Sequence, residues 1–362
     1  MDEDIRRLYA NSLKPSFEAD WDDNLSLGKN LVNLLSRSIY NVQYPEVIIS
    51  YSFLNTRLCQ SFPLLVLQGS AGTGKSTCLD MVCKIRGLDK AFACGQSTYA
   101  SLRNYIEIQR NGIQKDGVCL LLDNLQSQHL TIGEPLYNFL LTGYDEKTSK
   151  VSIASNNGEN IDFDTFAPKV ISTVYNLYQD SSFSELQRRL LLIEFHKHEP
   201  LFIASRSDYD LSQLPKYFLK FWCTEESYKT FFESRSSINH FFNENLGAFS
   251  DELITKKEIM MDLITTSFVI GLFETIADCV MYWSEYLEEI GSKKSIIDIH
   301  LKDYIDCLDN DNLINLSHLK QYISALKSGG YIDSHFSFKK VKEIICIKFN
   351  YKETKEGLKK NG

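Results

Sequence analysis

Residues 64–80 read LLVLQGSAGTGKSTCLD, and their glycines, lysine and hydroxyls are spaced for phosphate chemistry. Gly69, Gly74, Lys75 and Ser76 satisfy the pattern G-x-x-x-x-G-K-[ST], which here follows an apolar run and precedes a helix-compatible stretch. Such a loop turns its backbone N–H groups around phosphates, while the lysine reaches the terminal phosphates and the serine ligates Mg²⁺. The predicted ATP-binding residues are Gly69, Ser70, Ala71, Gly72, Thr73, Gly74, Lys75, Ser76 and Thr77.

A second group of candidate site residues lies at the end of the apolar run VCLLLDN at 118–124. Asp123 is the candidate acid that holds Mg²⁺ opposite Ser76. Asn124 stands where most additional-strand ATPases carry a glutamate that polarises the attacking water. An amide orients a water and cannot accept its proton, so slow hydrolysis, or hydrolysis through another group, is expected.

Two further elements carry candidate nucleotide contacts. The strand-like APKVIST (167–173) ends in two hydroxyls, of which Thr173 rather than Ser172 is the preferred sensor of the γ-phosphate. In ELQRRLLLIEF (185–195), either Arg188 or Arg189 is the candidate guanidinium that stabilises the transferring phosphate, supplied in ring ATPases by a neighbouring subunit. The alternative for both is a surface arginine paired with acids.

Alternating strands and helices have to position these residues. Buried runs such as 118–124 are typical of parallel strands covered on both faces, so an α/β fold with a parallel sheet is expected. The stretch 150–163 alternates around Asn157-Gly158, a strong hairpin signal. The predicted organisation is a helical lead-in (1–60), a P-loop ATPase core (61–200), a helical lid or bundle (201–295), a winged helix (296–352) and a basic tail (353–362).

The winged-helix prediction rests on a helix from Ser317 to Lys327, capped by Ser317 and stopped by Gly329-Gly330, with strands expected at 332–338 and 343–349. The helix and a wing near 339–342 are expected to contact duplex DNA. The alternative is a solvated face on a protein-binding module. The candidate nucleic-acid contacts are Lys320, Lys327, Lys339, Lys340 and Lys342.

Composition sets outer limits on function. A net charge of −8 over 362 residues argues against a surface coated with nucleic acid, although 339–360 holds eight lysines and three glutamates, a local +5. The nine cysteines include no C-x-x-C pair, which predicts neither disulfides nor a zinc site. An acidic start without an apolar leader, and an apolar stretch at 263–283 interrupted by Glu274 and Asp278, predict a cytoplasmic chain without a membrane partner.

Several of these segments together resemble a known family. FDTFAPKVISTVYNL, ELQRRLLLIEF, STYASLRNYI, VCLLLDN and the Gly-Tyr of LLTGYDEK look like the AAA+-like ATPase domains, related to superfamily 3 helicases, that are often joined to primases on phages, plasmids and integrated elements. The resemblance covers about residues 45–200. It implies a ring or filament of ATPase subunits acting on DNA, with a primase on a separate chain as a candidate partner.

The resemblance also implies residue roles, carried by Lys75, Asp123, Thr173 and Arg189, and a hairpin at 150–163 that points into a pore. The chain departs from the family at Asn124. It departs again at the hairpin tip SNNGEN, which lacks a lysine or arginine to grip phosphates.

Two functions therefore stay open. The first is an oligomeric, ATP-hydrolysing helicase or helicase-like motor in mobile-element replication. The second is an ATP-dependent assembly switch that recruits a primase, transposase or defence effector without unwinding DNA, which Asn124 and the uncharged tip favour. A small-molecule kinase is a weaker third reading, because the helical tail and paired arginines have no role in it.

Overall fold

The computed structural model of the chain forms two compact units, 1–175 with 188–288, and 176–187 with 289–362. The residues that the structure describes are 16–39, 42–88, 92–93, 97–111, 117–126, 134–154, 160–174, 177, 184–196, 210–293, 301–302, 304–308, 313–328, 337–354 and 357–360.

The first unit contains the nucleotide-binding motif. Its helices are η1 (Phe17–Asp20), α2 (Leu27–Ser38), α3 (Pro45–Ser52), α4 (Lys75–Arg86), α5 (Tyr99–Asn111), α6 (Pro135–Thr142), α8 (Leu214–Trp222), α9 (Glu225–Glu244), η6 (Leu246–Ala248), α10 (Asp251–Val269) and α11 (Ile276–Lys293), the last of which ends in the second unit. Its strands are β1 (Leu64–Gly69), β2 (Phe92–Ala93), β3 (Leu120–Leu125), β4 (Lys150–Ala154), β5 (Asn160–Asp164), β6 (Lys169–Thr173) and β7 (Leu190–Phe195).

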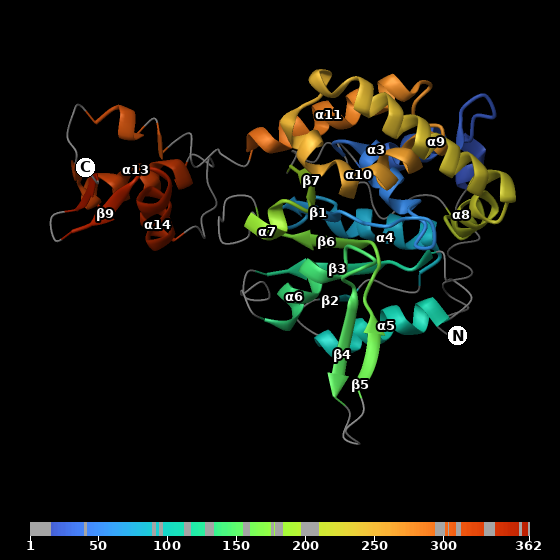
Figure 1. The fold of residues 1–362 in the computed structure, drawn as a ribbon, viewed down its shortest axis with the longest axis horizontal. Coiled ribbons are helices and arrows are strands. Elements are labelled where there is room, and N and C mark those ends of the chain that lie inside the picture. Colours follow the sequence, from blue (N-terminus) through green and yellow to red (C-terminus); the bar gives the residue numbers. More distant parts are fainter. Residues whose placement is uncertain are drawn as a thin grey trace. The chain divides into compact units, whose positions relative to one another are not determined.

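A five-stranded sheet in the order β2-β3-β6-β1-β7 lies at the centre of this unit, and all its strands run parallel (Figure 1). Strand β6 lies between β1, which leads into the glycine-rich loop, and β3, which carries Asp123. The first four residues of β1 and all of β6 are buried, as expected for strands covered on both faces. The predicted parallel α/β sheet is confirmed, and the 167–173 strand pairs with the Asp123 strand.

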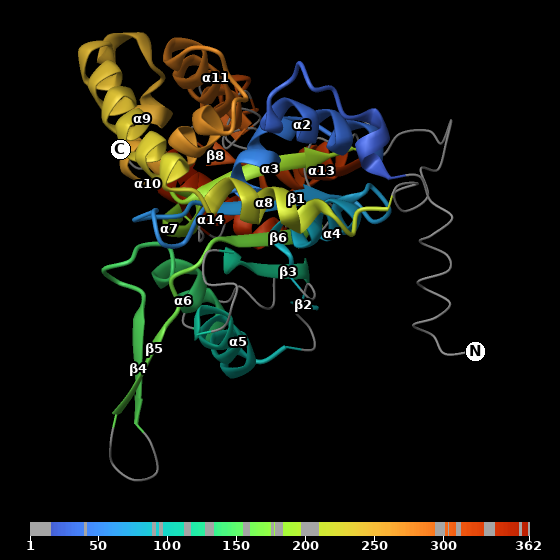
Figure 2. The ribbon, with the colours of Figure 1, turned by 90° about the vertical axis from the view of Figure 1, so that its right-hand side faces the viewer.

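Helices cover both sides of the sheet in Figures 1 and 2. Buried polar side chains fasten α4 and α10 to it. The Arg86 guanidinium, 2% exposed, donates to the carbonyls of Gly117 and Val118 just before β3. On α10, the buried Lys256 Nζ donates to Leu190 O at the start of β7, 3.0 Å away. The helical segments expected at 1–60 and 201–295 thus pack, where described and up to residue 288, in one unit with the sheet.

The hairpin predicted at 150–163 is present as the antiparallel pair β4–β5, in register from Lys150↔Asp164 to Ala154↔Asn160. Its predicted tip, Asn157-Gly158, lies outside the described residues. The pair projects away from the sheet (Figures 1 and 2). Helix α5 supports its base, because the Arg103 guanidinium lies 3.6 Å from the centre of the Phe163 ring.

The second unit holds α7 (Ser184–Gln187), helical residues at 301–302 and 304–306, β8 (Leu313–Ile314), α13 (Leu316–Ser328), α14 (Phe338–Lys348), β9 (Tyr351–Glu353) and β10 (Leu358–Lys360). Its three strands form an antiparallel sheet in the order β8-β10-β9. The unit has a core of its own, made of Leu301, Ile314, Leu319, Ile323, Leu326, Val341, Ile344, Ile345, Tyr351 and Leu358.

Two predictions for this unit are wrong. The stretch 343–349, predicted as a strand, is helical through Lys348, because Val341, Ile344 and Ile345 have the i, i+3, i+4 spacing that places apolar residues on one helical face. Ser317 does not cap α13, since the Asn315 side chain accepts from the Ser317 N–H at 2.8 Å. Gly329-Gly330 and most of the strand predicted at 332–338 lie outside the described residues, and Phe338 begins α14.

The apolar stretch 263–283 is divided between α10 and α11. Across the described part of the chain, none of the helices combines the length and apolarity needed to cross a bilayer.

Candidate phosphate and metal site

The glycine-rich loop connects β1 to α4 and depends on glycine at three positions. Gly72 and Gly74 have φ values of 77° and 99°, in the left-handed region that favours glycine. A Cβ on Gly69 would lie 2.2 Å from Phe195 O, so glycine is required where β1 passes β7. Helix α4 begins at Lys75 with no side-chain cap, which leaves its first N–H groups directed into the loop.

Lys75 is the buried cation of this loop. Its Nζ donates to Gly69 O at 2.7 Å and to Ser70 O at 2.6 Å. Burial lowers the pKa of the Lys75 ammonium, and the neighbouring Asp123 carboxylate partly raises it. A phosphate in the loop would add negative charge beside this ammonium and so offset the cost of its desolvation.

Ser76 and Asp123 come together although they are 47 residues apart. The Ser76 Oγ donates to Asp123 Oδ2 at 3.2 Å, across the gap between α4 and β3. Hydroxyl and carboxylate oxygens are ligands that Mg²⁺ prefers, usually together with substrate phosphates. The residues present therefore fit a magnesium ion bound beside the loop.

The end of β3 is irregular at this point. Leu122 pairs with Ile171 and Leu125 with Thr173, so β3 has one more residue than β6 between these pairs. The extra residue allows Asn124 to adopt φ 58°, and its side chain is exposed.

The two hydroxyls of β6 have different partners. Ser172, 1% exposed, accepts from Asn124 N–H at 2.9 Å and donates to Asp123 Oδ1. Thr173, the preferred sensor residue, is equally buried and donates to Leu125 O at 2.7 Å. The structure thus places Ser172 against Asp123. The sequence alone does not specify this choice, because it depends on the register in which β3 pairs with β6.

Arg188 and Arg189 lie at the amino-terminal end of the parallel strands, whereas the loop of the same chain lies at their carboxyl end. They directly precede Leu190, where β7 starts, whereas the loop follows the carboxyl end of the parallel strand β1. A strand of this length separates its two ends by roughly 17–20 Å. Arg188 is exposed, and the Arg189 guanidinium lies 4.3 Å from the centre of the Tyr144 ring.

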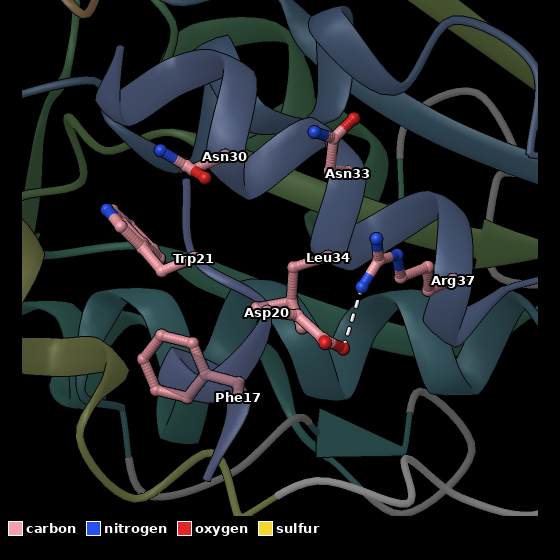
Figure 3. A pocket seen from close by; sticks show the side chains of 7 residues that line it. All are labelled: Phe17, Asp20, Trp21, Asn30, Asn33, Leu34 and Arg37. Carbon is pink, nitrogen blue, oxygen red and sulfur yellow. Dashed lines mark ion pairs between the residues drawn. The ribbon is translucent and has the colours of Figure 1, made fainter. Parts of the chain in front are cut away.

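The N-terminal helix α2 ends against the loop. A Cβ on Gly74 would lie 3.2 Å from Ile39 Cγ2, at the residue that caps α2. On the side of α2 facing η1 is a shallow cleft, in which Asp20 and Arg37 form an ion pair of 2.7 Å (Figure 3). Because these are its two charged side chains, the cleft offers a ligand mainly apolar and amide groups.

The candidate DNA-contacting lysines belong to two helices of the second unit. Lys320, which is exposed, and Lys327 lie on α13. Lys339, Lys340 and Lys342 lie on α14 rather than on a wing, and Lys342 pairs with Glu353 of β9.

Comparisons with known proteins add little to this geometry. No protein-family model and no curated protein matches the chain. Among solved structures, it is similar to one titled SCCmec type IV Cch, an active helicase, with 16% identity over 90% of this chain and 67% of that chain, and a TM-score of 0.44. A likeness this distant carries no weight for function, which the geometry of the site has to support by itself.

Proposed function

We propose that this chain is an oligomeric, AAA+-like ATPase that acts on DNA as a helicase or helicase-like motor, in the replication of a mobile element. The observation that supports it best is the meeting of Lys75, Ser76 and Asp123 across a sheet in which one strand, β6, separates the loop strand from the acid strand. One strand between the loop strand and the acid strand supports an additional-strand P-loop core.

In this proposal the loop N–H groups and Lys75 bind the phosphates of ATP, and Ser76 with Asp123 holds Mg²⁺. The ion would supply positive charge that stabilises the charge developing on the phosphates during transfer. Asn124, exposed next to Asp123, orients the attacking water without accepting its proton. Ser172, rather than the predicted Thr173, is the hydroxyl of β6 that contacts Asp123 in this site.

The position of the arginines supports assembly. Because Arg188 and Arg189 lie at the far end of the strands, neither reaches the phosphates of its own subunit, so a role for one of them in hydrolysis would require the phosphates of a neighbour. We assign this role to Arg189, as the resemblance implies.

The second unit supports the DNA-binding part of the proposal. Its order of helix, strand, two helices and two strands, with the β8-β10-β9 sheet, is the order expected of a winged helix and supports that part of the proposal. In such helix pairs the second helix contacts the major groove. That helix is α14, which carries Lys339 and Lys340.

The test is ATP hydrolysis by the purified chain with and without single-stranded and duplex DNA, together with unwinding of a forked duplex. Stimulation by DNA and unwinding, both lost in Lys75→Ala, are expected. Hydrolysis that DNA does not change, with no unwinding, would reject the motor.

Asn124 favours one second candidate, the ATP-dependent assembly switch that recruits a partner such as a primase, transposase or defence effector. Without a carboxylate at this position, ATP would persist long enough to hold an assembly together. Assembly that depends on ATP, without unwinding, would support the switch over the motor.

A further inference from the structure

The end of β3 contains a short hydrogen-bond chain that the proposed ATPase chemistry does not by itself require. Asn124 N–H donates to Ser172 Oγ at 2.9 Å, and the Ser172 hydroxyl donates to Asp123 Oδ1. Ser76 Oγ donates to the other carboxylate oxygen of Asp123, Oδ2, at 3.2 Å. Asp123 is therefore oriented by a hydroxyl from each side.

The donor and acceptor of each of these hydrogen bonds follow from the bonding capacity of a hydroxyl. A serine hydroxyl has one proton to donate, and its oxygen accepts through lone pairs. Because Asn124 N–H occupies an acceptor position, the Ser172 proton is directed to Asp123. Ser172 is 1% exposed, so bulk water does not compete for either bond.

The conformation of Asn124 makes this series of hydrogen bonds possible. The extra residue in β3 and the φ of 58° go together with the Asn124 N–H facing β6. Asparagine adopts the left-handed region more readily than most residues, whereas a β-branched residue there is a strained outlier. The asparagine thus has a backbone role that a glutamate would fill less well.

We infer that Ser172 is a positioning residue that sets the orientation of Asp123 for a divalent cation, and that the left-handed backbone of Asn124 holds Ser172 in place. The inference rests on the proposed function, because it requires a cation at Ser76 and Asp123. It adds a second role to the site, in which a buried hydroxyl orients the carboxylate of Asp123.

The experiment measures cation affinity separately from nucleotide affinity. Mn²⁺, which can be followed by electron paramagnetic resonance in place of Mg²⁺, is titrated into the full chain with a non-hydrolysable ATP analogue. Binding of the same analogue is measured in EDTA. Ser172→Ala is expected to weaken Mn²⁺ binding about tenfold, the effect of losing one hydrogen bond to a charged group. Binding in EDTA is expected to stay within about twofold of wild type, and Ser172→Thr to restore Mn²⁺ affinity to within about threefold.

Ser52→Ala is the matched control, since it removes another fully buried serine hydroxyl, bonded to Ile48 O at 2.7 Å in α3. It is expected to leave Mn²⁺ affinity unchanged. Unchanged affinity in Ser172→Ala, equal loss in the control, or loss of binding in EDTA as well would overturn the positioning role. Absence of any analogue binding by wild type would instead reject the proposed nucleotide site, and this inference with it.

A second pair of variants tests the backbone of Asn124. Asn124→Val places a β-branched residue at φ 58° and is expected to weaken Mn²⁺ binding as much as Ser172→Ala does. Asn124→Gly adopts that conformation freely and is expected to lose less Mn²⁺ affinity than Asn124→Val. Equal losses in the two variants would mean that the amide side chain, and not the backbone, supports Asp123.

Discussion

At the scale of single residues, Lys75 is the side chain on which nucleotide binding depends most directly. Its ammonium is buried between the carbonyls of Gly69 and Ser70, so Lys75→Ala removes the one cation that the described part of the loop contains. We expect at least a hundredfold loss of ATP affinity, about 3 kcal/mol, measured by calorimetry with Mg·ATP. Tight binding by the variant would show that the nucleotide binds elsewhere.

Asn124→Glu tests the exposed side chain next to Asp123. If this position faces the attacking water, a carboxylate there accepts a proton that an amide cannot, and turnover should rise at least several-fold. The left-handed backbone should reduce the free energy of unfolding by about 1 kcal/mol. Steady-state hydrolysis and urea unfolding measure the two effects. An unchanged rate would place the proton acceptor on another group.

The sequence predicted some of these residues and not others, for a physical reason. The loop from Gly69 to Thr77 is one continuous segment, so its pattern alone specifies which groups meet the phosphates. Asp123 was predictable from its place at the end of a buried run. The choice between Ser172 and Thr173 was not, because the register of β3 on β6, with Leu122 opposite Ile171, decides which hydroxyl meets the acid.

At the scale of elements, Lys169 anchors the start of β6. It is 3% exposed, and its Nζ donates to Gly143 O, Thr165 O and Ala167 O. These three carbonyls come from the end of α6 and from the segment between β5 and β6. Lys169 therefore joins the hairpin, α6 and the sheet.

Lys169 predicts a pH dependence of stability. Burial lowers its pKa to about 7, whereas the unfolded chain keeps the ordinary value near 10.4. Between these values the unfolded chain binds one more proton, so the free energy of unfolding rises with pH by roughly 1.4 kcal/mol per unit. Urea unfolding of wild type and Lys169→Met at pH 7.5 and 9 should show a rise about 2 kcal/mol larger in wild type. Equal changes would mean that Lys169 titrates outside this range.

Element prediction succeeded where burial dominates. Continuous apolar runs predicted β1, β3 and β6. Prediction failed at 343–349, where isoleucines favour a strand by propensity. Packing of Ile344 and Ile345 on the core of the second unit favours the helix.

At the scale of the whole molecule, assembly would complete the active site. Arg189→Ala should reduce ATP hydrolysis by the assembled protein by at least about tenfold, because the guanidinium acts on a neighbour's phosphates. A subunit with Lys75→Ala keeps Arg189, and one with Arg189→Ala keeps the loop. Mixing the two inactive variants should therefore restore part of the activity, as measured by phosphate release. Full activity of monomeric Arg189→Ala would remove the arginine from the site.

The second unit predicts which helix contacts DNA. Lys339→Ala with Lys340→Ala on α14 should weaken duplex binding by the full chain and lower the slope of log affinity against log salt by about 2. Lys320→Ala with Lys327→Ala on α13 is the matched pair and should change the slope less. Fluorescence anisotropy over a salt series measures both. A larger effect from the α13 pair would reverse the assignment.

The path from the hairpin to the metal site has a mechanical consequence. Strand β5 ends at Asp164, β6 starts at Lys169, and β6 is hydrogen-bonded along its length to β1 on one side and β3 on the other. A pull on the hairpin would load these ladders in shear, where several hydrogen bonds resist together, rather than peel them one at a time. A displacement of the hairpin would then shift β6 along its own axis as a rigid strand. Ser172, which orients Asp123, would move with it, so the geometry at Asp123 would respond to a force on the hairpin.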